Sequence, residues 1–157
     1  MKLLKRLRVL CCTNHGSALV ELALITPALT LLLVGAVDFG RAGYVGIEVQ
    51  NAAHAGAEYG SLHPSNTVGI TAAAQQSAPN LSNLIVSAPT WGCECSDGTS
   101  YTASCTTTPV CSASNARGSN VVHRVKVSTS AVYKPMAPWP GIPSSITLYG
   151  SATIRGN

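Results

Sequence analysis

Four cysteines in the C-terminal half of the chain are the side chains best suited to chemistry. One, nine and five residues separate them in turn: Cys93, Cys95, Cys105 and Cys111. The C-x-C pair is too close to bridge itself without strain, so two disulfides would join the first pair to the second, either crossed or nested. The alternative is a zinc site with the cysteines as ligands. Zinc motifs place about two to four residues between paired ligands, and gaps of one, nine and five residues fit that spacing poorly. We therefore expect two disulfides and no metal.

The other chemistry-bearing residues do not form a recognisable catalytic site. The four histidines are scattered, and no two of them have the spacing of metal ligands: His15, His54, His63 and His123. The sequence contains no G-x-S-x-G, no glycine-rich phosphate loop and no H-E-x-x-H. We therefore expect neither enzymatic activity nor a cofactor.

The net charge of +4 comes from the N-terminus alone. Of ten basic residues, Lys2, Lys5, Arg6 and Arg8 lie in the first eight positions, and the remaining six are balanced by six acidic ones. A chain of 157 residues that is 46% hydrophobic and 10% charged is too apolar for a disordered tail. Because no basic surface remains after the leader, we expect no nucleic-acid partner.

The basic leader precedes an apolar segment that predicts a membrane helix. Residues 18–37 contain one charge, Glu21, and as a helix they would span the hydrocarbon core of about 30 Å. The positive-inside rule places the N-terminus in the cytoplasm and the chain beyond about residue 40 outside. The expected organisation is a leader over 1–16, a span over 17–40 and an extracytoplasmic domain over 41–157, where cysteines oxidise.

Glu21 within the apolar segment requires an explanation, since a carboxylate at the centre of a bilayer costs on the order of 3 kcal/mol. A cut between Gly16 and Ser17 would place a new amino group one helical turn from this carboxylate, close enough for the two charges to neutralise each other. A short basic leader, a glycine, a small residue and a glutamate is the processing pattern of type IV prepilins. Pro27 removes one hydrogen bond of the helix and should kink it.

Four segments of the chain resemble the TadE-like family of minor pilins and pseudopilins from the tight-adherence secretion system. They are GSALVELALITP at 16–27, VDFGR at 37–41, QNAAHAGA at 50–57 and ITLYGSATI at 146–154. Leu22 stands where the major Flp pilins have an aromatic residue, which favours a minor pilin.

This resemblance implies a role for each residue of the leader junction and a set of partners. Gly16 would precede the cut, Ser17 would become the new N-terminus, and Glu21 would serve in recognition and assembly. The implied partners are the inner membrane, a prepilin peptidase, other pilins and the tight-adherence machinery.

Periodicity predicts the elements that position these residues. The membrane helix should continue over 40–59 with a thin face of small apolar residues, and Gly60 to Pro64 should end it. A short helix over 68–77, capped by Asn66 or Thr67, should precede strands at 84–87, 121–133 and 145–155. The 121–133 strand should present Val121, His123, Val125, Val127 and Thr129 on one face.

The expected fold is therefore α+β, with a long transmembrane helix continuing into a small pilin-like antiparallel sheet. The segments 91–111, with the cysteines, and 134–143, with its prolines, should be loops. Two functions fit: a minor pilin or pseudopilin acting in pilus assembly and surface adhesion, and a single-pass membrane-anchored binding module outside any filament. They differ in whether the leader is removed.

Overall fold

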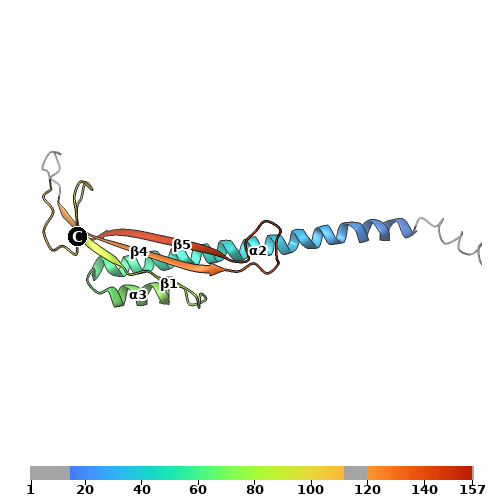
Figure 1. The fold of residues 1–157 in the computed structure, drawn as a ribbon, viewed down its shortest axis with the longest axis horizontal. Helices are drawn as coiled ribbons and strands as arrows, with labels where there is room; N and C mark the ends of the chain where they lie inside the picture. Colours follow the sequence, from blue (N-terminus) through green and yellow to red (C-terminus); the bar gives the residue numbers. More distant parts are fainter. Residues whose placement is uncertain (1–14, 112–119, 157) are drawn as a thin grey trace, which may run out of the picture. The chain divides into compact units, whose positions relative to one another are not determined.

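The computed structural model describes residues 15–111 and 120–156 and has the predicted α+β architecture (Figure 1). The helices are α2 (His15–Leu62) and α3 (Thr67–Gln76), and the strands are β1 (Ile85–Val86), β2 (Thr90–Cys95), β3 (Tyr101–Ala103), β4 (Val121–Tyr133) and β5 (Ile146–Gly156). The chain divides into two compact units, Met1–Gly40 and Arg41–Asn157, each considered separately. Residues 1–14, most of the predicted leader, lie outside the described residues.

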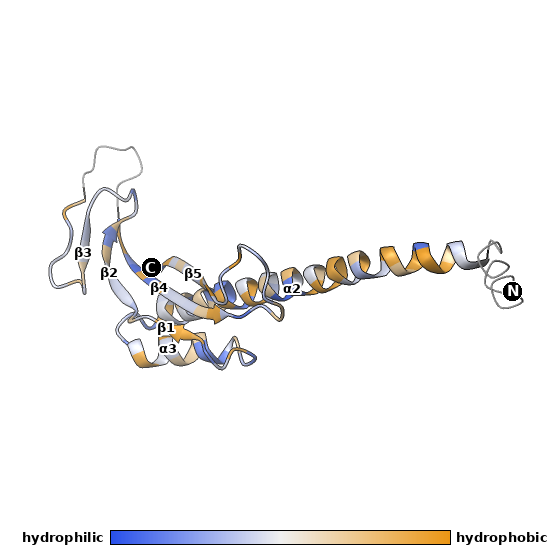
Figure 2. Cartoon of the chain, turned by 45° about the vertical axis from the view of Figure 1, so that its right-hand side comes forward, coloured by the Kyte–Doolittle hydropathy of each residue, from blue (hydrophilic) through white to orange (hydrophobic). Residues whose placement is uncertain are grey.

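In the first unit, α2 exposes its large apolar side chains. Leu24 is 75% exposed and Leu32 is 70% exposed, and Figure 2 shows hydrophobic residues along this part of the helix. By length and composition, α2 is the one helix among the described residues that could cross a membrane. An exposed apolar surface of this kind is stable only against lipid or protein.

In the second unit, the same helix packs one narrow face against the sheet. Val49, Ala52 and Ala53 are fully buried there. The Thr129 hydroxyl donates a hydrogen bond of 2.7 Å to the Val49 carbonyl oxygen. A Cβ on Gly150 would lie 2.7 Å from that same oxygen, so only glycine allows β5 to come this close to α2.

The second helix begins one residue before the predicted start, at a predicted cap. The Asn66 side chain accepts a 2.9 Å hydrogen bond from the Gly69 backbone N–H, which satisfies one free donor of the first turn of α3. Ile70 and Ala74 face the domain interior and are buried. Helix α2 ends at Leu62, within the Gly60–Pro64 segment that was predicted to end it.

The sheet is antiparallel and is built around β4. Strand β5 pairs along β4 from His123 opposite Gly156 to Tyr133 opposite Ile146. On the other edge, β1 pairs near Ser130 and β2 pairs with 121–126, so β1 and β2 follow one another along the same edge. Strand β3 then pairs with β2.

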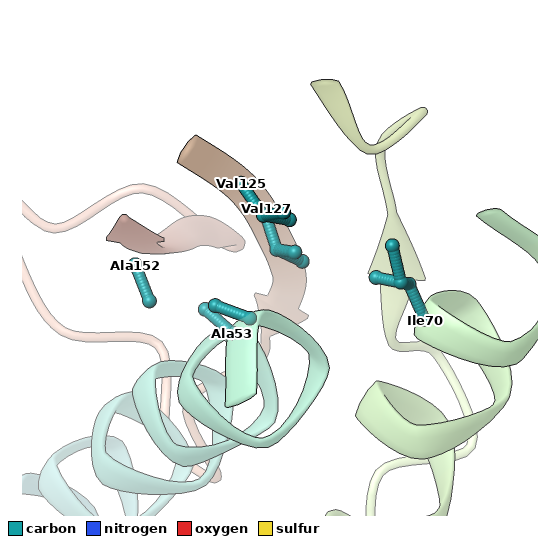
Figure 3. Packing of buried hydrophobic residues seen from close by; sticks show 6 residues of the cluster. Ala53, Ile70, Val125, Val127 and Ala152 are labelled. Carbon is teal, nitrogen blue, oxygen red and sulfur yellow. The ribbon is translucent and has the colours of Figure 1, made fainter. Parts of the chain in front are cut away.

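The core between helix and sheet is made of small residues (Figure 3). It consists of Ala53, Ala57, Ile70, Val125, Val127 and Ala152. The predicted alternation of β4 is confirmed at Val125, Val127 and Thr129, which are buried. Val121 instead is 43% exposed, because it precedes the residues that β5 pairs with. Alanine and valine bury little apolar area each, so this core supplies modest hydrophobic stabilisation.

The segment 91–111, predicted to be a loop, contains two strands. Strands β2 and β3 form a hairpin with Gly92 opposite Ala103 and Glu94 opposite Tyr101. The prediction failed because Gly, Ser, Thr and Cys in this segment show no apolar alternation. Pairing with β4 and the disulfides determine its conformation instead.

Candidate functional site

Gly16 and Ser17 lie in the first turn of α2, and both are exposed. A Cβ built on Gly16 would meet no described atom within 4 Å, and Gly16 does not have the left-handed backbone that favours glycine. Neither packing nor backbone geometry within the described chain therefore requires a glycine at position 16.

Glu21 lies four residues after Ser17 on the exposed part of α2. Its neighbours Val20 and Leu24 are 62% and 75% exposed. Across residues 15–111 and 120–156 no ion pair includes Glu21. The helix therefore presents a lone carboxylate on an otherwise apolar surface.

Pro27 lies inside α2, which continues through it without a break. Two hydroxyls near it are satisfied within the helix: Thr26 donates to the Leu22 carbonyl oxygen at 2.6 Å, and Thr30 donates to that of Thr26 at 2.8 Å. Such internal hydrogen bonds are what a lipid environment requires of polar side chains. The kink at Pro27 stays a prediction.

The small residues of α2 divide into two groups. A Cβ on Gly56 would lie 3.1 Å from the Ala74 Cβ, and one on Gly60 would lie 2.7 Å from Val125 Cγ1. These glycines permit close packing within the domain. At Gly43 and Gly46, by contrast, a Cβ would have no described atom within 4 Å.

The four cysteines form two crossed disulfides that join β2 to the segment after β3. Cys93 is bonded to Cys105 and Cys95 to Cys111, with Cα–Cα distances of 5.0 Å and 5.5 Å. Of the two pairings that spacing left open, the structure has the crossed one. The β2 cysteines of the two bridges are two positions apart, on one face of the strand. Each bridge ties β2 to the segment that follows β3 in the chain.

A buried carboxylate holds the same hairpin to the rest of the sheet. The Glu94 side chain is 5% exposed, forms an ion pair with Arg155 on β5, and lies 3.4 Å from Nε of Arg124 on β4. The Arg124 guanidinium also lies over the Tyr101 ring, 5.2 Å from its centroid. Strands β2, β3, β4 and β5 are therefore linked by charge as well as by backbone hydrogen bonds.

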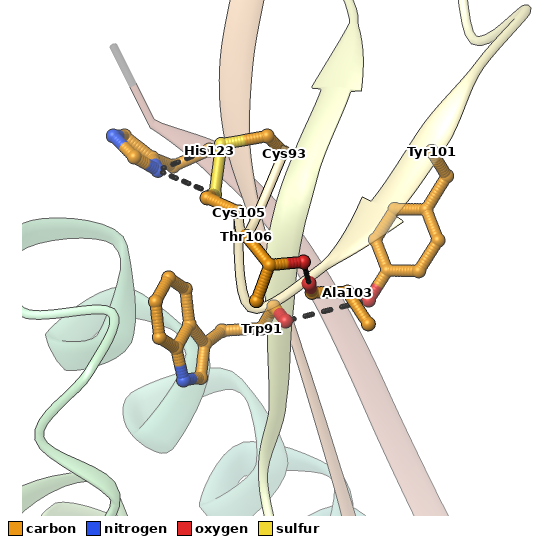
Figure 4. Close-up of a disulfide and its surroundings, with 7 residues drawn as sticks. All are labelled: Trp91, Cys93, Tyr101, Ala103, Cys105, Thr106 and His123. Atoms are coloured by element: carbon orange, nitrogen blue, oxygen red, sulfur yellow. Dashed lines mark hydrogen bonds between the residues drawn. A yellow bond between two sulfur atoms is a disulfide. The ribbon is translucent and has the colours of Figure 1, made fainter. Parts of the chain in front are cut away.

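His123 is the residue at this site that the sequence did not identify (Figure 4). Its Nδ1 lies 3.7 Å from Cys93 Sγ and 3.6 Å from Cys105 Sγ. These three side chains are the one group among the described residues whose possible ligand atoms come together, although both sulfurs are engaged in the disulfide. Cross-strand pairing of β2 with β4 places His123 opposite Cys93, a relation that spacing along the chain cannot reveal.

A second polar group lies near the start of the second unit. Tyr44 donates a 2.7 Å hydrogen bond to Glu48 Oε1 and accepts one of 2.9 Å from Asn80 Nδ2. The bond to Glu48 raises the pKa of the Tyr44 phenol above its ordinary value of 10.0, while the bond from Asn80 acts in the opposite direction. This network ties the helix to the loop that follows α3.

Comparison with known proteins gives one match. Residues 16–58 match the TadE-like protein family, a segment that lies entirely within α2 and includes Gly16, Ser17, Glu21 and Pro27. No curated protein and no solved structure matches the chain. The resemblance expected from the sequence is thereby confirmed over that segment: residues 16–58 are similar to the TadE-like protein family.

Proposed function

We propose that this protein is a minor pilin or pseudopilin-like component of a tight-adherence pilus or secretion apparatus. The observation that carries the proposal is that the TadE-like match falls on an exposed apolar helix preceded by a basic leader. The role is one of assembly and surface adhesion rather than catalysis. Its partners would be other pilins and the tight-adherence machinery.

The chain would be anchored once in the bacterial inner membrane before assembly. Residues 17–40 would span the bilayer, the four basic residues of the leader would stay in the cytoplasm, and residues 41–157 would lie outside. Disulfides between Cys93 and Cys105 and between Cys95 and Cys111 support an oxidising location for the domain.

A prepilin peptidase would cut between Gly16 and Ser17. Support comes from the leader pattern, in which Gly16 follows a short basic segment and precedes a small residue and Glu21. The packing of the described chain does not itself require a glycine at position 16. A peptidase site that accepts only a small residue before the cut would exclude a larger side chain.

Glu21 would act after the cut. The new ammonium group of Ser17 would lie one helical turn from the Glu21 carboxylate, either in the same chain or in a packed neighbour. Pairing of these charges would offset the cost of placing the carboxylate in lipid. Assembly, rather than membrane insertion, is therefore the step that depends on Glu21.

The test of processing is mass spectrometry of the protein from native membranes with the peptidase present. Wild type should begin at Ser17, and Gly16→Glu should keep the full leader. Gly40→Ala is a matched control, because Gly40 is also a helical glycine at which an added Cβ would meet no described atom within 4 Å, and this variant should be cut as wild type is. A wild-type chain that keeps Met1 would favour the anchored binding module instead.

The test of assembly is copurification with the tight-adherence machinery. Glu21→Gln should enter the membrane at least as well as wild type but fail to copurify. Glu58→Gln, an exposed position on the same helix, should behave as wild type. Equal recovery of Glu21→Gln and wild type would refute the pairing role.

A further inference from the structure

The two disulfides start from equivalent positions on β2, but their β2 cysteines are paired with different residues on β4. Cys93 is paired across the sheet with His123, and Cys95 is paired with Val121. Since positions two apart on a strand share a face, the imidazole and the isopropyl group occupy corresponding places beside the two bridges. The same sheet therefore contains one disulfide beside a histidine and one beside a valine, so the effect of the histidine on a disulfide can be measured within one protein.

His123 is in contact with both sulfurs of its disulfide. Nδ1 lies 3.7 Å from Cys93 Sγ and 3.6 Å from Cys105 Sγ, so either sulfur could receive a hydrogen bond or proton from the same nitrogen (Figure 4). The charged residues adjacent to this pair, Glu94 and Arg124, occupy the alternate positions of their strands and point to the other face.

In both bridges the first cysteine is more deeply buried than the second. Cys93 and Cys95 are buried, at 4% and 0% exposure, whereas Cys105 and Cys111 are half-buried. An incoming thiolate would therefore reach the second cysteine of each bridge, and the buried first cysteine would leave. In the first bridge the leaving sulfur faces His123, and in the second it faces Val121.

The turn that carries Cys105 is also strained. Ser104 and Cys105 have φ values of 54° and 46°, in the left-handed region that residues with a side chain rarely adopt. The bridge to Cys93 and a 2.9 Å hydrogen bond from the Ser104 N–H to the Trp91 carbonyl oxygen both hold this turn against β2, so opening the bridge would remove one restraint on the strained turn.

We propose that Cys93–Cys105 is a thiol–disulfide exchange site for a dithiol, and that His123 stabilises the departing Cys93 sulfur. This goes beyond the assembly role and does not depend on it. An imidazole beside a nascent thiolate makes that sulfur a better leaving group, which is how basic side chains activate cysteines elsewhere.

The exchange balances as a two-electron transfer. One thiolate of the dithiol attacks Cys105 Sγ, the Cys93–Cys105 bond breaks, and Cys93 leaves as a thiolate that takes a proton from Nδ1 of a His123 imidazolium, which becomes a neutral imidazole. The second thiol of the reagent then attacks the reagent sulfur of the mixed disulfide, Cys105 is released as a thiolate, and the proton of the second thiol passes to it. The dithiol ends as a disulfide, and both cysteines end as thiols.

The experiment is a reduction time course of the full chain in detergent micelles with dithiothreitol as the dithiol. Free thiols are alkylated at intervals, and peptide mass spectrometry reports each bridge separately. In wild type, Cys93–Cys105 should open about tenfold faster than Cys95–Cys111. His123→Val should slow the first bridge about three- to tenfold and leave the second unchanged.

The reciprocal variant separates the histidine from the effect of exposure. Val121→His places an imidazole opposite Cys95 and should accelerate the second bridge, while the first keeps its wild-type rate. If His123→Val does not fold, the rate of reduction of Cys93–Cys105 is measured in His123→Gln instead, which keeps a polar side chain of similar size. Equal opening of the two bridges in wild type, or unchanged rates in the folded His123 and Val121 variants, would overturn the proposal.

Discussion

The side-chain amide of Gln50 pairs with the backbone of Ser151 as a neighbouring strand would. Gln50 Nε2 donates to the Ser151 carbonyl oxygen at 3.0 Å, and the Ser151 N–H donates to Gln50 Oε1 at 3.2 Å. Ser151 lies on β5, whose other edge is paired with β4. A residue of α2 therefore satisfies two backbone groups on the outer edge of the sheet.

We expect Gln50→Ala to lower the free energy of unfolding by about 1 to 2 kcal/mol, because two hydrogen bonds are lost and the backbone groups must find water. Urea unfolding of the detergent-solubilised chain, followed by circular dichroism, measures this. Gln76→Ala, an exposed change at the end of α3, should stay within about 0.5 kcal/mol of wild type. Equal effects of the two changes would contradict a role for the amide pair.

Replacing two glycines of α2 by alanine should change the stability of the protein in opposite directions. At Gly60 a Cβ would lie 2.7 Å from Val125 Cγ1 and 3.1 Å from Ile70 Cδ1, so Gly60→Ala should destabilise the domain by about 1 to 3 kcal/mol. At Gly46 a Cβ meets no described atom within 4 Å, so Gly46→Ala should stabilise the helix by about 0.5 to 1 kcal/mol. Thermal unfolding of both variants tests the pair, and a stable Gly60→Ala would show that the interior is loosely packed.

Removal of the Glu94 charge should loosen the cysteine hairpin. The side chain is 5% exposed, but its partners Arg155 and Arg124 are 53% and 34% exposed and can regain water, so we expect Glu94→Gln to cost about 1 to 3 kcal/mol. Hydrogen exchange should rise first over β2 and β3. Glu58→Gln, at an exposed position, should leave both readouts unchanged.

Tyr44 should titrate above pH 10. The folded chain holds the phenolic proton more tightly than the unfolded chain does, because of the bond to Glu48. Its contribution to stability is therefore present below pH 10 and is lost as the pH rises through the raised pKa. Absorbance at the tyrosinate band should show this late component in wild type. Tyr44→Phe should remove it, Glu48→Gln should move it to lower pH, and Tyr149→Phe should leave it in place.

The sequence predicted the elements whose side chains alternate or recur with a clear period. The buried residues Val125 and Val127 follow the two-residue period of a strand, and Val49 and Ala53 follow the period of a helix. The start of α3 was predicted to within one residue because Asn66 caps the helix through a local hydrogen bond. In each case the determining interaction lies within a few residues along the chain.

The hairpin and its histidine could not be predicted, because pairing between distant strands defines them. Cys93 meets His123 only through the β2–β4 register, 30 residues along the chain, and that register depends on the whole sheet. The crossed disulfides likewise follow from where β3 returns beside β2. Gly16 and Ser17, which we propose as the processing residues, carry no structural signature within the described part of the chain, since an external enzyme would read them.

All four disulfide-bonded cysteines precede β4 in the chain, which has a consequence for biogenesis. A ribosome completes Cys111 before it makes Val121–Tyr133, the strand that aligns β2. Early oxidation is therefore guided only by the short β2–β3 pairing, and a nested arrangement formed at that stage must be reshuffled once the last third of the polypeptide arrives. A nascent chain stalled before residue 121 should accumulate mixed bridges, whereas the finished protein converges on one set.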